Sequence, residues 1–221
     1  LIPQNKIKEN LERFRLNPAG QGGSAGQKNC QVGPSVLYEE SILHLATAGQ
    51  FIVCNDKYGL PGTVLPAYCT ATGKLFLSQL DDETLETWVH SHNLVPYTAN
   101  TIIDPDELLK QIRQTRERGY GIVISKLYYF VACISIPVIG QDNRVLGALN
   151  FSTKLEHFDA LNNEKFISDV TNTIRSAQFT KAIKHTIPHR ALYPVGDHFS
   201  LPRNPVRNQV RAGGLDKTAP T

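Results

Sequence analysis

The fold is decided by the stretch Leu65-Pro66-Ala67-Tyr68-Cys69-Thr70-Ala71-Thr72-Gly73-Lys74. An extended segment that contains proline runs into small and hydroxyl residues, and an apolar run follows at once. This pattern predicts a loop that becomes a helix, with Thr70 or Thr72 as its N-cap. Small side chains leave the free backbone N–H groups accessible to an anion, which the helix dipole favours. An ordinary capped helix without a ligand explains the same residues.

The composition fits one domain of ordinary size with extensions. The chain has 221 residues, of which 41% are hydrophobic and 19% charged, so it can bury a core. A net charge of +3 permits an anionic partner without indicating one. The four cysteines show no CxxC spacing, which favours reduced thiols and a cytoplasmic protein. The longest apolar runs are far shorter than the ~20 residues of a membrane helix.

The chain divides into three parts by composition. Residues 1–34 are expected to form a flexible linker with a short amphipathic helix at 6–15, which leaves no room for a folded module. Residues 35–184 are expected to form the compact domain. Residues 186–221 contain many prolines and glycines, and we expect an extended or disordered tail there.

The first half of the expected domain combines a hairpin with two helices. Residues 41–46 and 51–55 predict two strands joined by a turn. One helix is expected at about 70–79. Another is expected to begin at Asp81, with Leu85, Trp88 and Val89 on its buried face.

The second half begins with a clear helix start. Asp104 can cap this helix, Pro105 suits its first position, and Gly119 is placed to end it. Strands are expected at 120–125, 131–139 and 145–151, with a hairpin turn between the last two. A final helix is expected at about 162–184.

Small polar residues alternate with apolar ones in the last two expected strands. Cys133 and Ser135 lie in the first, and Asn150 and Ser152 follow in the second. Period-two geometry places Asn150 and Ser152 on the same face of the sheet. They either line a small polar pocket or simply meet solvent.

No nucleotide-binding loop, metalloprotease motif or nucleophile elbow is present, so no cofactor or metal is expected. His90 and His92 lack a carboxylate or thiol to complete a metal site. Cys69 at a helix N-terminus would have a lowered thiol pKa, and a nucleophile there needs a base such as His44. A packed small residue is the commoner role for such a cysteine.

Several segments, in order and at matching spacing, resemble the C-terminal effector-binding domain of IclR-family transcriptional regulators. The stretch at 65–75 is similar to the LPLHCTAxGKA signature of that family. Further matching segments are Thr98–Asp104, Arg116–Tyr120, Cys133–Val138 and Leu146–Ser152. The resemblance covers about residues 35–184. It implies an α+β fold, a curved antiparallel sheet flanked by helices as in GAF domains.

The resemblance also implies a role. Domains of this family sense small organic or aromatic acids and form homodimers or tetramers. The family binds DNA through a winged helix-turn-helix that precedes this domain. Because residues 1–34 are too short for such a reader, we expect this chain to contact DNA only through a domain that it lacks.

The resemblance maps an effector site onto this sequence. It places the effector carboxylate at the backbone amides of Ala71 and Thr72, beside the capping Thr70. Polar strand groups map to Cys133, Asn150 and Ser152.

Two departures from the family pattern are aromatic. Tyr68 stands where the family usually has His, and Phe130 stands where it usually has Gly, after Tyr128 and Tyr129. We therefore expect these residues to shape the pocket for an aromatic or larger anion, rather than a two-carbon acid.

Three functions compete at this point. The first is the ligand-binding domain of a transcriptional regulator. The second is an enzyme that uses the same pocket with Cys69 or Cys133 as nucleophile. The third is a regulatory module that acts without DNA, by forming mixed oligomers.

Overall fold

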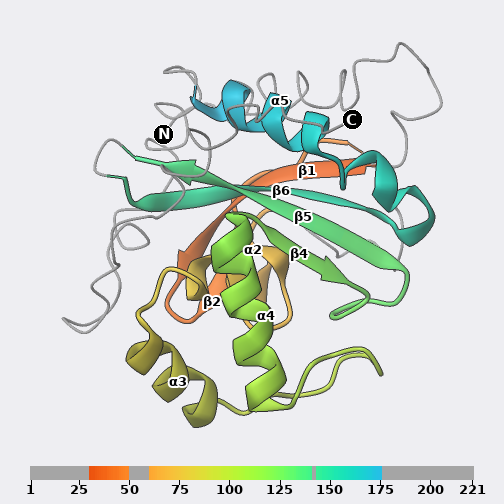
Figure 1. Cartoon of the computed structure of the whole chain (residues 1–221). Helices are drawn as coiled ribbons and strands as arrows, with labels where there is room; N and C mark the ends of the chain where they lie inside the picture. Colours follow the sequence, from red (N-terminus) through yellow and green to blue (C-terminus); the bar gives the residue numbers. More distant parts are fainter. Residues whose placement is uncertain (1–29, 50–59, 141–142, 176–221) are drawn as a thin grey trace, which may run out of the picture.

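The structure, a computed structural model, describes residues 30–49, 60–140 and 143–175. Within these ranges the strands form one six-stranded antiparallel sheet in the order β3-β2-β1-β6-β5-β4. Its strands are β1 (Cys30–Tyr38), β2 (Ser41–His44), β3 (Val64–Pro66), β4 (Gly121–Ile124), β5 (Val131–Ile139) and β6 (Val145–Lys154). Figure 1 shows α5 (Glu164–Arg175) on one face of this sheet, and α2 (Ala71–Leu77) and α4 (Pro105–Arg118) on the other. The expected α+β architecture is confirmed.

Strand β1 corrects the expected start of the compact domain near Ser35. It begins at Cys30 and pairs with β2 on one side and β6 on the other. The stretch at 18–26 that predicted the linker lies outside the described residues, whereas Gly33 and Pro34 have structural roles in β1. A Cβ atom on Gly33 would lie 2.2 Å from the carbonyl oxygen of Ala46, and Pro34 accepts a 2.9 Å hydrogen bond from Leu45.

The expected hairpin between residues 41–46 and 51–55 is only partly tested. Strand β2 is present, but it ends at His44 and pairs with β1 and with β3. The segment 51–55 lies outside the described residues, as do the short helix at 6–15 and the tail at 186–221.

Capped helices occur where the sequence predicts them. The Thr70 hydroxyl accepts the N–H of Gly73 at 3.1 Å and caps α2. Asp81 caps α3 (Asp82–Ser91) in the same way. Asp104 caps α4, which ends at Gly119 in the left-handed conformation (φ 81°). Each cap satisfies a backbone N–H that the helix itself leaves without a partner.

The two faces of the central strands follow the predicted alternation. One face packs on α5, with Ile134 and Phe151 in the core beside Phe166. The other carries Cys133 and Asn150 and meets α2. Both faces are covered, which explains why β5 is buried along almost all of its length.

The end of the described chain partly matches expectation. Helix α5 begins at Glu164 and buries Phe166, Val170 and Ile174, while the expected continuation to residue 184 lies outside the described residues. A 3-10 helix at Leu155–Ala160 was not predicted. No helix in the described ranges is long and apolar enough to cross a membrane.

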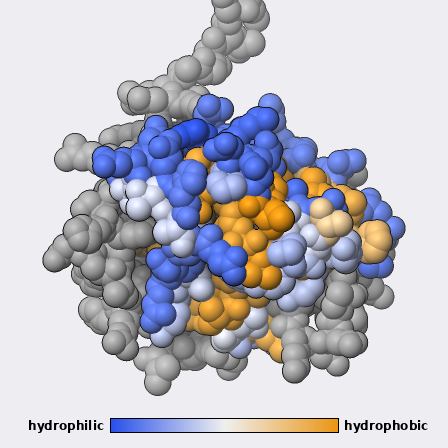
Figure 2. Space-filling model, turned by 90° about the horizontal axis from the view of Figure 1, so that it is seen from below, coloured by the Kyte–Doolittle hydropathy of each residue, from blue (hydrophilic) through white to orange (hydrophobic). Residues whose placement is uncertain are grey.

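Apolar residues also reach the surface. In Figure 2, which views the molecule from below, an apolar band crosses the middle of the face and polar residues surround it. The large apolar side chains that are exposed in the described ranges are Leu60, Val64, Val95, Tyr97, Ile103, Ile124, Tyr129, Phe130 and Leu155.

Candidate functional site

The start of α2 is held against the sheet by two close backbone approaches. A Cβ atom on Gly73 would lie 2.0 Å from the carbonyl oxygen of Ala67, and one on Gly121 would lie 2.0 Å from that of Ala71. Any larger residue at either position would force the backbones apart. Gly73 therefore fixes the first turn of α2 against the loop that precedes it, and Gly121 fixes this turn over β4.

The first turn of α2 has two backbone N–H groups without an acceptor among the described residues. The N–H of Gly73 is capped by Thr70, and that of Lys74 bonds to the Thr70 carbonyl at 3.0 Å. Ala71 and Thr72 make no such bond, and both residues are buried. Buried backbone donors are rarely left without a partner, so these two are placed to receive one.

A chain of buried polar side chains crosses from α2 to β5 and β6. Ser135 donates to Oδ1 of Asn150 at 2.8 Å, so the 2.7 Å bond between Thr72 and Ser135 has Thr72 as donor. Asn150 in turn donates from Nδ2 to Ser152 at 2.9 Å. The Ser152 hydroxyl lies 3.3 Å from the Cys133 thiol. This array confirms the shared face predicted for Asn150 and Ser152.

A small cavity of about 20 Å³ lies next to this array. It has room for about one water molecule. The residues that line it are Ile42, His44, Leu65, Cys69, Thr70, Ala71, Thr72, Val123, Lys126, Leu127, Tyr128, Val131, Cys133 and Asn150. Five of the eight predicted site residues therefore meet at one cavity, and Ser152 is hydrogen-bonded directly behind it.

The two aromatic departures do not line this cavity, contrary to expectation. The hydroxyl of Tyr68 donates to the Val95 carbonyl at 2.7 Å, and its ring packs in the core beneath α2. Phe130 is 71% exposed and has a positive φ of 62°. Tyr128, two residues earlier, lines the cavity instead. The aromatic residue that this loop contributes to the cavity is therefore Tyr128.

Sequence reasoning missed one charged lining residue. Lys126 comes from a segment without a recognisable motif, and only the fold brings it here. His44, considered above as a base for Cys69, also lines the cavity. Ser135 was visible in the polar alternation of its strand. It is fully buried and joins Thr72 to Asn150, so it belongs to the site.

The thiol and the histidine at the cavity are not activated. Burial raises the pKa of Cys69 to about 12, against a smaller opposing effect of the Lys74 charge. Burial also lowers the pKa of His44 to about 4, and its Nδ1 is bonded to the Ser35 hydroxyl at 2.8 Å. At neutral pH the thiol is protonated and the imidazole is neutral.

Lys74 is a buried lysine close to the site. Its side chain is 1% exposed, and the ammonium donates to Oε1 of Gln111. Burial lowers its pKa to about 7, and the charge of Lys126 adds to the effect. A lysine with a neutral amide as its hydrogen-bond partner is unusual inside a protein.

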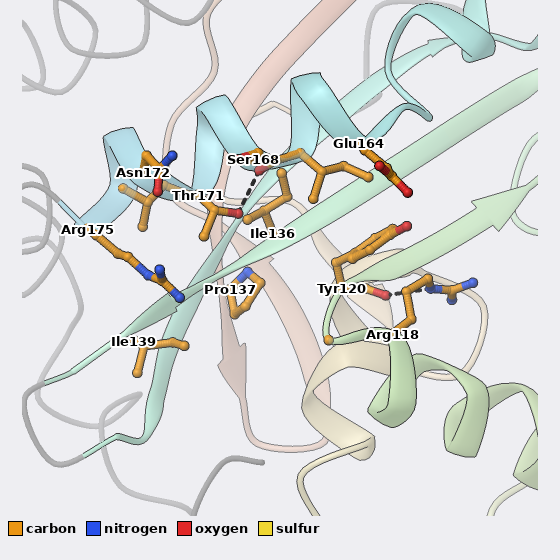
Figure 3. A pocket seen from close by; sticks show the side chains of 13 residues that line it. Arg118, Tyr120, Ile136, Pro137, Ile139, Glu164, Ser168, Thr171, Asn172 and Arg175 are labelled. Atoms are coloured by element: carbon orange, nitrogen blue, oxygen red, sulfur yellow. Dashed lines mark hydrogen bonds between the residues drawn. The ribbon is translucent and has the colours of Figure 1, made fainter. Parts of the chain in front are cut away.

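A separate hollow of about 430 Å³ lies on the opposite face of the sheet, beneath α5. Figure 3 shows Ile136, Pro137 and Ile139 of β5 across from α5, with Arg118 at one end and Arg175 at the other. Pairing of β5 with β4 ends at Ser135. Pro137, two residues later, has no N–H that could extend this pairing. None of the predicted site residues lines this hollow.

A family model described as "Bacterial transcriptional regulator IclR C-terminal" matches residues 57–178, more than half of the chain. The chain belongs to the IclR family of bacterial transcriptional regulators. The matched part includes the first turn of α2 and the polar strand residues of the site.

Two curated relatives illustrate the family membership. The Pca regulon regulatory protein of Pseudomonas putida is 36% identical over 92 residues, which cover 42% of this chain and 32% of that protein. The p-hydroxybenzoate hydroxylase transcriptional activator of Acinetobacter baylyi is 32% identical over 96 residues, 43% of this chain and 35% of that protein. The chain thus spans about a third of the length of these relatives.

Solved structures agree on the fold. The transcriptional regulator YaiJ aligns with a TM-score of 0.65 at 17% identity, over 83% of this chain and 96% of that chain. The inducer-binding domain of PobR from Acinetobacter, a double mutant in complex with 3-hydroxybenzoic acid, aligns with a TM-score of 0.61 at 21% identity. The alignment covers 83% of this chain and 98% of that chain.

Proposed function

We propose that this IclR-family domain binds a small organic or aromatic acid and passes the binding event to a transcriptional response. The observation that carries the proposal is the buried polar array of Thr72, Ser135 and Asn150 beside a cavity in an otherwise apolar core. Each hydrogen bond of such an array adds only a small net stability, and convergent polar groups beside a cavity are typical of a ligand site. PobR, which shares the fold, is solved with a hydroxybenzoic acid.

The carboxylate of the acid lies at the free backbone N–H groups of Ala71 and Thr72 in this proposal. Asn150 and Thr72 contact the rest of the polar end of the ligand, with Ser152 and Cys133 behind. Because about 20 Å³ is too small for any organic acid, binding requires the loop at 126–130 to move outward and take Tyr128 with it.

An enzymatic role for Cys69 finds little support. Its thiol is protonated at neutral pH, and the lowered pKa of His44 makes the imidazole a weak base. A thiol nucleophile needs the reverse, a lowered thiol pKa and a stronger base. The curated relatives described above are transcriptional regulators, which fits a domain that senses and does not catalyse. Self-association and DNA binding through a reader domain remain predictions.

The test is a thermal-shift screen of mono- and dicarboxylic acids and of hydroxybenzoates. An acid at 100 times its Kd adds about 2.7 kcal/mol to the free energy of unfolding. Thr72→Val removes the hydroxyl while it preserves the shape, and we expect it to reduce the shift. Thr173→Val, an exposed position on α5, serves as the control. A screen in which no acid shifts the melting temperature contradicts the proposal, as does a shift that both variants retain.

A further inference from the structure

A third space, a cleft of about 440 Å³, opens between α4 and the outer edge of β4. Lys126 and Val123 line both this cleft and the small cavity at α2, so the two spaces are neighbours. Gln111 and Arg118 of α4 form the opposite wall. None of the eight predicted site residues lines this cleft.

The edge of β4 presents backbone donors to this cleft. In the described sheet β4 is the last strand and pairs only with β5. The Ser125 N–H donates to the Val131 carbonyl at 2.7 Å. Because every second residue of a strand points its N–H and C=O groups to the same side, Val123 and Gly121 also direct theirs toward β5. The N–H groups of Ile122 and Ile124 therefore point away from β5, along the wall of the cleft.

The charge around the cleft is positive and poorly compensated. The Lys126 ammonium makes no hydrogen bond or ion pair within the described ranges, and Lys74 has Gln111 as its one hydrogen-bond acceptor there. Arg118 uses its guanidinium on the Tyr120 carbonyl and the Thr115 hydroxyl. The Glu107 carboxylate acts electrostatically on both lysines, but it is already paired with the Lys110 ammonium at 3.5 Å.

We infer that this cleft binds a small oxyanion, a carboxylate or a phosphate, between the Lys126 ammonium and the edge amides of β4, with Lys74 as the buried cation behind Gln111. The anion supplies the counter-charge that neither lysine has. It is either free in solution or the second acidic group of an effector that also reaches α2, and the two sources share one chemistry.

The first experiment is a calorimetric titration of the chain with inorganic phosphate, at constant ionic strength in chloride. We expect saturable binding that Lys126→Gln weakens at least about tenfold. Lys165→Gln, at a lysine that is 69% exposed on α5, removes the same charge and is expected to leave the affinity unchanged. Absence of saturable binding overturns the inference, and so does an equal loss in both variants.

The second experiment places the missing charge in the protein itself. Gln111→Glu puts a carboxylate next to the Lys74 ammonium, so we expect a melting temperature higher by about 2–4 °C and loss of phosphate binding. Thr173→Glu adds the same charge on α5 and is expected to do neither. A Gln111→Glu variant that binds phosphate as well as the parent chain, or that melts lower, contradicts the inference.

The source of the anion is settled by comparing glutarate with butyrate. If the cleft holds the second acid group of an effector, glutarate competes with phosphate and loses affinity in both Asn150→Leu and Lys126→Gln. If the anion is free, phosphate and butyrate bind together and Asn150→Leu affects only butyrate. Phosphate binding that survives Asn150→Leu supports the cleft even where no acid binds at α2, so failure of the effector site remains distinguishable.

Discussion

Strands β5 and β6 have two buried faces of opposite chemistry. The face toward α5 is apolar, and Phe151 meets Phe166 there edge-to-face at 5.0 Å between ring centroids. The face toward α2 carries the hydrogen-bonded array of Thr72, Ser135 and Asn150. The two sets alternate along the same strands, so neighbouring residues in the sequence serve different purposes.

The difference separates stability from recognition. Each apolar side chain on the α5 face contributes stability in proportion to the area it removes from water. Each polar group on the α2 face loses its hydration and regains hydrogen bonds within the protein, for a small net gain. The α5 face therefore holds the sheet together, and the α2 face keeps donors and acceptors available beside a cavity.

The largest effect is expected at Lys74, on the α2 side. Burial lowers its pKa from the ordinary 10.5 to about 7, so the unfolded chain binds more protons between these values and stability rises with pH. Over pH 7 to 10.5 the contribution of Lys74 approaches ~4–5 kcal/mol, whereas the raised pKa of the buried Cys69 thiol opposes it above about pH 9. Urea unfolding across this range should therefore show a rise in the parent chain relative to Lys74→Met. A rise of the same size in both would assign it to other groups.

Phe151→Ala tests the apolar face. Truncation of a fully buried phenylalanine leaves a cavity, and we expect a loss of about 3–5 kcal/mol in the free energy of unfolding. Acid binding, measured below the unfolding transition, should keep its Kd, because the ring points away from α2. A large change in Kd without loss of stability would reverse the division of roles between the two faces.

Asn150→Leu tests the polar face at nearly constant volume. Ser135 then lacks its acceptor and Ser152 lacks its donor, so we expect a cost of about 1–3 kcal/mol together with loss of acid binding. Ser135→Ala should cost less in this background than alone, since its partner is already gone. A double-mutant cycle by urea unfolding measures the coupling, and strict additivity would show that the array is not cooperative.

The smallest effect is expected at Phe130, in the loop beside the cavity. Its φ of 62° is unfavourable for a bulky residue and suits glycine. Because the ring is 71% exposed, Phe130→Gly loses little packing and should stabilise by about 0.5–1 kcal/mol. Tyr129→Gly, whose hydroxyl accepts from the Ala99 N–H at 3.0 Å, should destabilise instead. The urea concentration at the midpoint of unfolding, measured for each variant, distinguishes stabilisation from destabilisation.

Local patterns predicted much of this fold. The caps Thr70 and Asp104 were readable because a side chain of fixed length reaches a donor three residues away. The alternation of β5 and β6 was readable because side chains of a strand point to opposite faces. Strand β1 was missed, since Gly33 and Pro34 suit a linker equally well until the close approach of Ala46 is known.

For the site, the sequence by itself determined which residues of 65–74 start a helix and that Asn150 and Ser152 share a face. Only the tertiary structure decided which side chains complete the cavity. Tyr128, Lys126 and His44 line it while Phe130 faces solvent, because the direction of a loop residue depends on backbone angles set by distant contacts. The charge balance around Lys74 likewise depends on α4, which folds over it from more than thirty residues away.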